Sequence, residues 1–341
     1  MGKWEMVRLG DVCDGVSSNI AQKDLENNEG LYPIYGASGF IKCVNFYKHD
    51  AEYIAVVKDG AGIGRTTLHP TKSSVIGTMQ AIIPRAFVNP KYLYYAVSAM
   101  NLAKYHTGAT IPHIYFKDYK KETLPLPPLE VQRQIADVLD RANALIEKRK
   151  AQIDKLDLLV KSQFIEMFGD PVANSKGWEK KALGKECDLI TGNTPSRAVS
   201  DYYGNFIEWI KSDNINTPYM HLTQASEMLS EAGLSVGRSV QADAILMTCI
   251  AGSISCIGNV AIADRKVSFN QQINAVVSNS NNVYYMYYLF LLSKSNIQST
   301  VSMSLKGILS KGKLSELDFP FPPVNLQIAF GDFVQQVEAQ K

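Results

Sequence analysis

Apolar residues recur every three or four positions between residues 129 and 168, and no proline or glycine interrupts this stretch. The recurring positions are Ile135, Leu139, Ala142, Ile146, Ile153, Leu156, Val160 and Met167. This spacing gives a helix one apolar stripe and is typical of a coiled coil. At ~1.5 Å per residue, the helix would be roughly 60 Å long. A stripe of this length is expected to be covered by a second helix.

A shorter helical pattern starts at residue 324, directly after a second cluster of prolines. Its apolar face consists of Val324, Phe330, Phe333, Val334 and Val337. The prolines before each helix fix an extended entry, because their rings cannot continue a helix backwards. The sequence therefore predicts that the second helix is the partner of the first.

Outside these helices, short apolar or alternating runs bounded by glycine, proline, asparagine and serine predict β-strands. Examples are "EYIAVV", "QAIIP", "DAILMTCI" and "NVAIA". Helical stretches at residues 90–105 and 283–298 follow them. The predicted fold class is α+β, with an α/β domain at residues 1–128, the long helix at 129–170, a second α/β domain at 171–323 and the distal helix at 324–341.

The two domains begin and end with similar strings. "KWEMVRLG" at residues 3–10 matches "GWEKKALG" at 177–184, and "LPLPPLEVQ" at 124–132 matches "FPFPPVNLQ" at 319–327. Between them, Ile63-Gly64 matches Ile257-Gly258. The offset grows from 174 residues at the first match to 195 at the last, so the second domain has about twenty extra residues between Gly184 and Ile257. The sequence predicts a tandem duplication of one topology.

Composition restricts the possible functions. The 341 residues carry a net charge of only +2, so contact with nucleic acid would need a local basic surface. Five cysteines without a C-x-x-C pair are expected to be reduced, and five histidines lack metal-ligand spacing, so no metal site is predicted. No apolar run is long enough to span a bilayer and no signal peptide opens the chain, so we expect a cytoplasmic protein without membrane contact.

Catalytic motifs are not found either. "GAGIGR" at residues 60–65 is not a dinucleotide-binding fingerprint, because its glycine spacing differs and "TTLHP" follows in place of a helix. A base-flipping methyltransferase places an acid or amide before its proline pair and an aromatic residue after it, and the proline clusters here have neither. The sequence therefore favours recognition over catalysis.

The order of the elements resembles the specificity (S) subunit of type I restriction–modification systems. The resemblance covers essentially the whole chain and is carried by "LPLPPLEVQRQIADVL", "LIEKRKAQIDKL", "FGDP", "TGNTPSR" and "YPIYGASG". It implies two target recognition domains, each reading one half of a bipartite, asymmetric site on double-stranded DNA. It also implies an antiparallel coiled coil that acts as a spacer.

The resemblance further implies a set of partners. Two methyltransferase (M) subunits would dock on the coiled coil, and restriction (R) subunits would join them. S-adenosylmethionine, ATP and Mg would bind in those partner subunits, so no cofactor is expected in this chain, which would not itself be an enzyme.

The distal helix departs from the family pattern, because it covers 18 residues against 40 for the first helix. We interpret it as truncated. The C-terminal half of the first helix is then expected to lack an intramolecular partner, and isolated chains could associate through it.

Polar side chains beside glycine-containing turns are the candidates for DNA contact, because backbone and side chains can approach DNA closely there. In the first domain they are Asn19, Lys23, Tyr35, Ser38, Lys58, Arg65, Lys72, His106, Thr110 and His113. In the second they are Thr194, Ser196, Arg197, Tyr203, Lys211, Ser212, Asn214, Gln271, Gln272, Lys306 and Lys311. An ordinary solvated loop is the alternative for each.

Two other functions remain open at this stage. A truncated allele could bind methyltransferase subunits without reading DNA, which would make the chain a protein-interaction module. An enzyme acting alone is the third possibility.

Overall fold

The computed structural model describes residues 4–60, 62–108, 112–301 and 307–341. The chain divides into two compact units, unit 1 at Met1–Arg149 and unit 2 at Lys150–Lys341. No helix in the described part of the chain is both long and apolar enough to cross a membrane.

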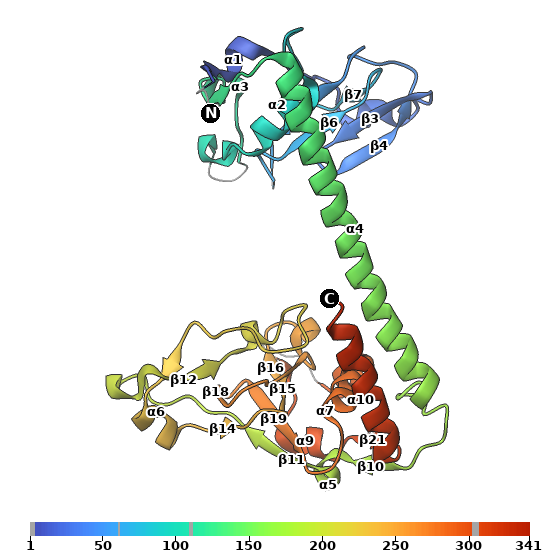
Figure 1. Ribbon diagram of the computed structural model, residues 1–341, viewed down its shortest axis with the longest axis vertical. Coiled ribbons are helices and arrows are strands. Elements are labelled where there is room, and N and C mark those ends of the chain that lie inside the picture. The colour runs from blue at the N-terminus through green and yellow to red at the C-terminus, as the bar shows by residue number, and fades with distance from the viewer. Residues whose placement is uncertain (1–3, 61, 109–111, 302–306) are drawn as a thin grey trace. The chain divides into compact units, whose positions relative to one another are not determined.

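Unit 1 is built on an antiparallel sheet of order β2-β8-β5-β6 (Figure 1). These strands are β2 Cys13–Ser17, β8 Met79–Pro84, β5 Tyr53–Val57 and β6 Thr66–His69. A smaller sheet of order β4-β3-β7 contains β3 Tyr32–Gly36, β4 Gly39–Val44 and β7 Ser74–Val75, and β3 runs parallel to β7. The ends of the unit pair as β1 Met6–Arg8 with β9 Thr123–Pro125. The helical segments are α1 Leu9–Val12, η1 Gln22–Leu25, α2 Pro90–Ser98, η2 Leu102–Tyr105 and α3 Phe116–Tyr119.

Unit 2 repeats this plan with a sheet of order β11-β19-β15-β17 and a smaller one of order β13-β12-β18-β14. The strands are β11 Cys187–Thr191, β12 Tyr203–Ile210, β13 Met228–Leu229, β14 Ser239–Val240, β15 Ile245–Thr248, β17 Val260–Ile262, β18 Val267–Phe269 and β19 Ile273–Ser278. Two further pairs are β10 Lys180–Ala182 with β21 Asp318–Pro320, and β16 Ile250–Ala251 with β20 Gly307–Ile308. The helical segments are α5 Leu183–Glu186, η3 Ser200–Tyr202, η4 Ser212–Asn214, α6 Glu231–Val236, η5 Ile254–Cys256, α7 Val283–Leu292, α8 Lys294–Ser299 and α9 Lys311–Glu316.

The predicted duplication is confirmed by strand order and register. Ser17 pairs with Gln80 in unit 1, and Thr191 pairs with Asn274 at the same place in unit 2. The predicted match of Gly64 with Gly258 also holds. Both glycines have positive φ, 82° and 80°, and each donates its N–H to the last residue of an equivalent strand, Val57 of β5 or Thr248 of β15. The extra residues of unit 2 lie between β11 and β17, within the predicted interval.

The long helix α4 runs without a break from Leu129 to Phe168. Its C-terminal turns pack against α10, Val324–Glu338, in unit 2 (Figure 1). The rings of Phe164 and Phe330 lie 5.4 Å apart, and Lys341 forms an ion pair with Asp157. Asp157 precedes Phe164 in the chain, whereas its partner Lys341 follows Phe330. The two helices are therefore antiparallel.

This pairing corrects the prediction about the unpaired part of α4. The C-terminal turns of α4 do have a partner, because α10 runs antiparallel to α4 and packs against these turns. The exposed stretch lies nearer the middle of the helix, where Leu139 is 36% and Ile146 51% exposed and Ala142 is also exposed. Self-association through α4 therefore stays a prediction, and it now concerns these residues.

The buried positions near the end of α4 also differ from the predicted seam. Val160, Phe164 and Phe168 are buried at 0%, 0% and 3%, one helical turn apart, whereas Met167 is only half-buried. A strict alternation of three and four residues does not predict Phe164. This end of α4 packs against α7 as well as against α10, so more than one stripe of the helix is covered.

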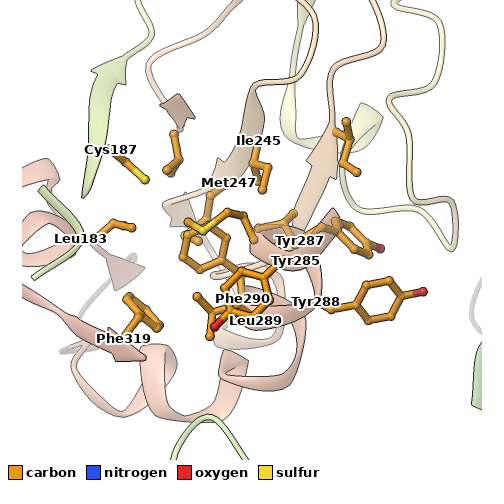
Figure 2. Close-up of a cluster of buried hydrophobic side chains, with 14 of the residues drawn as sticks. Leu183, Cys187, Ile245, Met247, Tyr285, Tyr287, Tyr288, Leu289, Phe290 and Phe319 are labelled. Atoms are coloured by element: carbon orange, nitrogen blue, oxygen red, sulfur yellow. The ribbon is translucent and has the colours of Figure 1, made fainter. Parts of the chain in front are cut away.

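The core of unit 2 forms where α7 lies against the large sheet (Figure 2). Tyr285, Tyr287, Tyr288 and Phe290 are buried in one cluster with Met247 of β15. Burial raises the pKa of Tyr285, whose hydroxyl donates to the carbonyl of Pro320 over 2.8 Å. The five cysteines are free thiols.

A buried glutamine joins the start of α4 to unit 1 by hydrogen bonds, and an equivalent glutamine joins the start of α10 to unit 2. Gln132 accepts from the Asn89 N–H over 2.8 Å and donates to the Pro127 carbonyl over 2.9 Å. Gln327 makes the same bonds to Asn282 and Pro322, over 3.0 and 2.8 Å. The two glutamines recognised as equivalent in the sequence therefore have one structural role, which we call the glutamine latch.

Replacement of Gln132 by leucine should destabilise unit 1 by about 2 kcal/mol, because buried backbone groups lose their partners while side-chain volume is retained. Denaturant unfolding of the full chain would measure this loss. Gln134→Leu, at an exposed position two residues further on, is the matched control and should leave stability almost unchanged. Equal effects of the two substitutions would contradict the latch.

Candidate DNA-recognition surface

Three loops of unit 1 meet beside the end of β5 and bring together several predicted residues. His113 bonds to Asp59 through its Nδ1, and the Ile114 N–H donates to the Lys58 carbonyl. Arg65, at the end of the glycine-rich segment, donates through Nη2 to the Ala37 carbonyl in the β3–β4 turn. Lys58, Arg65 and His113 thus belong to one surface.

A groove of about 410 Å³ continues this surface along the β3–β4 turn. Ser38 and Thr78 line it, and the Thr78 carbonyl accepts from the Lys58 N–H over 3.0 Å. Gly39 has φ +110°, which lets the chain reverse tightly here. The predicted Ser38 therefore joins Lys58 and Arg65, while Thr78 was not predicted.

The remaining predicted residues of unit 1 are more scattered. Asn19 lines a separate cavity of about 240 Å³ with Lys48 and His49, and Lys23 lines a different groove. Tyr35 is half-buried with its ring 4.6 Å from that of His69. Others are exposed, namely Lys72, which has φ +52°, and His106. Thr110 lies outside the described residues.

The equivalent edge of unit 2 is formed by the segment after β11 and the turn before β19. The Thr194 hydroxyl bonds to the amide oxygen of Gln271, so two predicted residues meet there. Gln272 bonds instead to Asn270 over 3.1 Å and is half-buried. A Cβ at Gly192 would lie 2.1 Å from the Asn270 carbonyl oxygen, so glycine allows these two segments to approach.

Arg197 and Lys211 converge on one carboxylate. Glu227 lies 2.9 Å from the Lys211 ammonium and 2.7 Å from the Arg197 guanidinium. Hydrogen bonds from Lys211 and then Arg197 lower the pKa of Glu227. The guanidinium also stacks 4.4 Å from the centroid of the Tyr203 ring, and the Tyr203 hydroxyl donates to the Pro195 carbonyl. Arg197 is thus held in place while its side chain stays 55% exposed.

Arg197→Ala should weaken binding to the target DNA by ~1–3 kcal/mol and change binding to random DNA little, if the exposed edge of Arg197 reads a guanine. Titration of both duplexes at fixed salt would measure this difference. Equal losses on the two duplexes would instead make Arg197 a phosphate contact.

The prediction that Asn214 contacts DNA is corrected, because this residue is buried. Only 7% of it is exposed, and its amide is used internally, accepting from the Lys211 N–H and donating to the Gln224 carbonyl. An asparagine in such a turn forms hydrogen bonds with nearby backbone groups. The sequence of a polar loop does not show whether an asparagine has this role or points outward to contact DNA. Ser212 is half-buried, Ser196 and Lys311 are exposed, and Lys306 lies outside the described residues.

The repeat itself points to a loop that we had not predicted. In the repeat, the segment from Gly252 to Ser255 stands before Gly258 as residues 58–63 stand before Gly64, and Ser253 and Ser255 are exposed. Lys294 of α8 holds this loop through the Ser255 carbonyl over 2.7 Å. The shared Ile-Gly pair was the signal that could have located it.

No group of three or more potential metal-ligating side chains occurs within the described ranges. The fold therefore consists of two units of the same topology with a long helix between them in the chain. That fold matches the crystal structure of the type I restriction–modification S subunit from M. genitalium, with a TM-score of 0.64 at 15% identity, covering 99% of this chain and 90% of that one.

The sequence model described as "Type I restriction modification DNA specificity domain" matches residues 1–156 and 175–341, and the chain belongs to this family. It is 23% identical over 381 residues to the MjaVIII specificity subunit of Methanocaldococcus jannaschii, covering 98% of this chain and 86% of that protein. It is 29% identical over 139 residues to the HindI specificity subunit of Haemophilus influenzae, covering 40% and 28%. The chain is accordingly a type I specificity subunit and not a catalytic one.

Proposed function

We propose that each unit reads one half of a bipartite DNA target. The observation that carries this proposal is that the two units share one topology but carry different polar side chains at the same edge. Unit 1 offers Lys58, Arg65 and His113 there, whereas unit 2 offers Thr194 and Gln271. Different side chains select different bases, so the target is asymmetric.

The helix supports the spacer function. Half-sites read from one face of a duplex lie about one helical turn, ~34 Å, apart. A continuous helix of 40 residues, roughly 60 Å in length, is long enough to span this distance.

The same proposal assigns the chemistry to partner subunits. Two methyltransferase subunits dock on the coiled coil of α4 and α10 and bind S-adenosylmethionine, and restriction subunits that use ATP and Mg join them. The chain itself then needs double-stranded DNA and these proteins as partners, and no cofactor of its own.

Co-purification with a methyltransferase subunit, followed by a DNA shift assay with unlabelled competitor, tests this proposal. We expect a complex that retains its target against excess random DNA. A complex that forms but shifts no DNA would favour the protein-interaction module. Methylation by the isolated chain would show instead that it is an enzyme.

A further inference from the structure

Each unit exposes one aromatic side chain at an equivalent place in the fold. Phe40 is 61% exposed in unit 1, and Tyr219 is 64% exposed in unit 2. Phe40 follows β3, which runs parallel to β7, and Tyr219 follows β12, which runs parallel to β18. Each aromatic residue therefore lies where the chain passes from this strand to its antiparallel neighbour, β4 in unit 1 and β13 in unit 2.

The residue after the repeated glycine holds the segment that carries each aromatic side chain. In unit 1 this residue is Arg65, which donates through Nη2 to the carbonyl of Ala37. In unit 2 it is Asn259, which donates through Nδ2 to the side-chain oxygen of Asn216 over 2.7 Å. Both acceptors stand three positions before the exposed aromatic residue. The two units thus fix the same segment with different side chains.

Phe40 is held in position although it is exposed. It pairs with Tyr35 across β3 and β4, and the two rings meet edge to face with their centroids 5.9 Å apart. The Tyr35 ring lies 4.6 Å from that of His69, which is buried. The Phe40 ring therefore rests on packed aromatic side chains.

The backbone on both sides of Tyr219 is also fixed. Pro218 restricts the chain before it, and the Tyr219 N–H donates to the Thr217 hydroxyl over 3.3 Å. The carbonyl of Met220 accepts from the Ile262 N–H over 2.8 Å, at the edge strand of the large sheet. Tyr219 is therefore presented to solvent from an anchored loop.

A cationic side chain lies beside each of these segments. The Arg65 guanidinium contacts the segment of Phe40 directly. In unit 2 the Lys294 ammonium bonds to the side-chain oxygen of Asn259, which holds the segment of Tyr219. An aromatic ring next to a cation suits a base step of DNA, because the ring can stack on the bases while the cation binds the phosphate backbone.

We propose that Phe40 and Tyr219 each insert between two adjacent base pairs of a half-site, which rests on the proposed function of each unit as the reader of one half-site. Insertion of a ring unstacks one base step and kinks the duplex. Pyrimidine–purine steps are the easiest to unstack, so each ring favours such a step without a hydrogen bond to any base. The two units thereby read the deformability of the DNA in addition to its base edges.

The full chain, purified with its methyltransferase subunits and bound to a duplex carrying the motif that they methylate, tests this proposal. The fluorescent adenine analogue 2-aminopurine replaces each adenine in turn, apart from the methylated one, because its emission rises when stacking is lost. Energy transfer between dyes at the two ends of the duplex reports the kinks whatever the base sequence. We expect an unstacked step in each half-site and a bent duplex.

Phe40→Ala should abolish the unstacking in one half-site only, and Tyr219→Ala should abolish it in the other half-site only. Each substitution should also reduce the bend and weaken target binding roughly tenfold, because the stacking of one ring on the bases is lost. Phe40→Leu should retain most of the effect, since leucine is also an apolar side chain that can insert.

Phe87→Ala and Phe206→Ala are the matched controls, because these rings are 48% and 54% exposed at other places in the two units. Both should leave unstacking and bending unchanged. A complex that prefers its target to random DNA, yet shows the same unstacking and bend with Phe40→Ala and Tyr219→Ala, would overturn the insertion and leave target reading intact.

Two further outcomes would also overturn the insertion. Loss of the methyltransferase subunits from the Phe40→Ala or Tyr219→Ala chain during purification would show that the ring contacts protein. An unsubstituted complex without preference for its target over random DNA would contradict the proposed function itself, and the insertion with it.

Discussion

Exchange of residues 1–125 for the corresponding unit of another family member should change one half of the methylated DNA motif and leave the other half unchanged. The junction suits this exchange, because β1 and β9 pair with each other and are replaced together. Sequencing that detects methylated adenine, in a host carrying the hybrid gene, would reveal both halves at once.

The reciprocal exchange of unit 2 is the control, and it should change the other half alone. Gln132 lies outside the exchanged segment and accepts from the main-chain N–H of residue 89, so the helix stays attached in the hybrid and a failure would concern recognition and not folding. A change in both halves, or in neither, would show that the units do not read independently.

Phe164→Ala should destabilise unit 2 by ~3–5 kcal/mol, the second large effect that we expect. The ring is fully buried and contacts Phe168, Tyr285 and Phe330, so its removal leaves a cavity among three aromatic side chains. Denaturant unfolding of the full chain, with circular dichroism as the readout, would measure the loss.

Ile165→Ala is the matched control for this prediction. It lies next to Phe164 on α4 but is 41% exposed, so its truncation should cost well under half as much. A similar loss from both substitutions would mean that helix propensity, and not packing against α7 and α10, stabilises this end of α4.

The sequence predicts the architecture well because duplication and helix periodicity are repeated signals. The strings at each end of the units correspond to β1–β9 and β10–β21, and the proline clusters precede α4 and α10 as expected. The equivalence of Gln132 and Gln327 is visible in the sequence. Their bonds to Asn89 and Asn282 are not, because those partners lie about forty-five residues away.

The side chains of the candidate surface are harder to predict. Asn214 and Arg197 are both polar residues in loops, yet one is buried by its own turn and the other is held exposed by Glu227. This difference depends on which segments meet in three dimensions. The same reason explains why the seam assigned Met167 while the structure buries Phe164 and Phe168.

The glutamine latch has a consequence for how such proteins change over evolutionary time. The bonds that both glutamines share join a side-chain amide to main-chain atoms, so replacement of neighbouring side chains does not remove these partners. Mutations can therefore accumulate in the exposed loops of either unit without loss of the bonds that hold its helix. Selection for a new target and maintenance of the scaffold then act on separate residues.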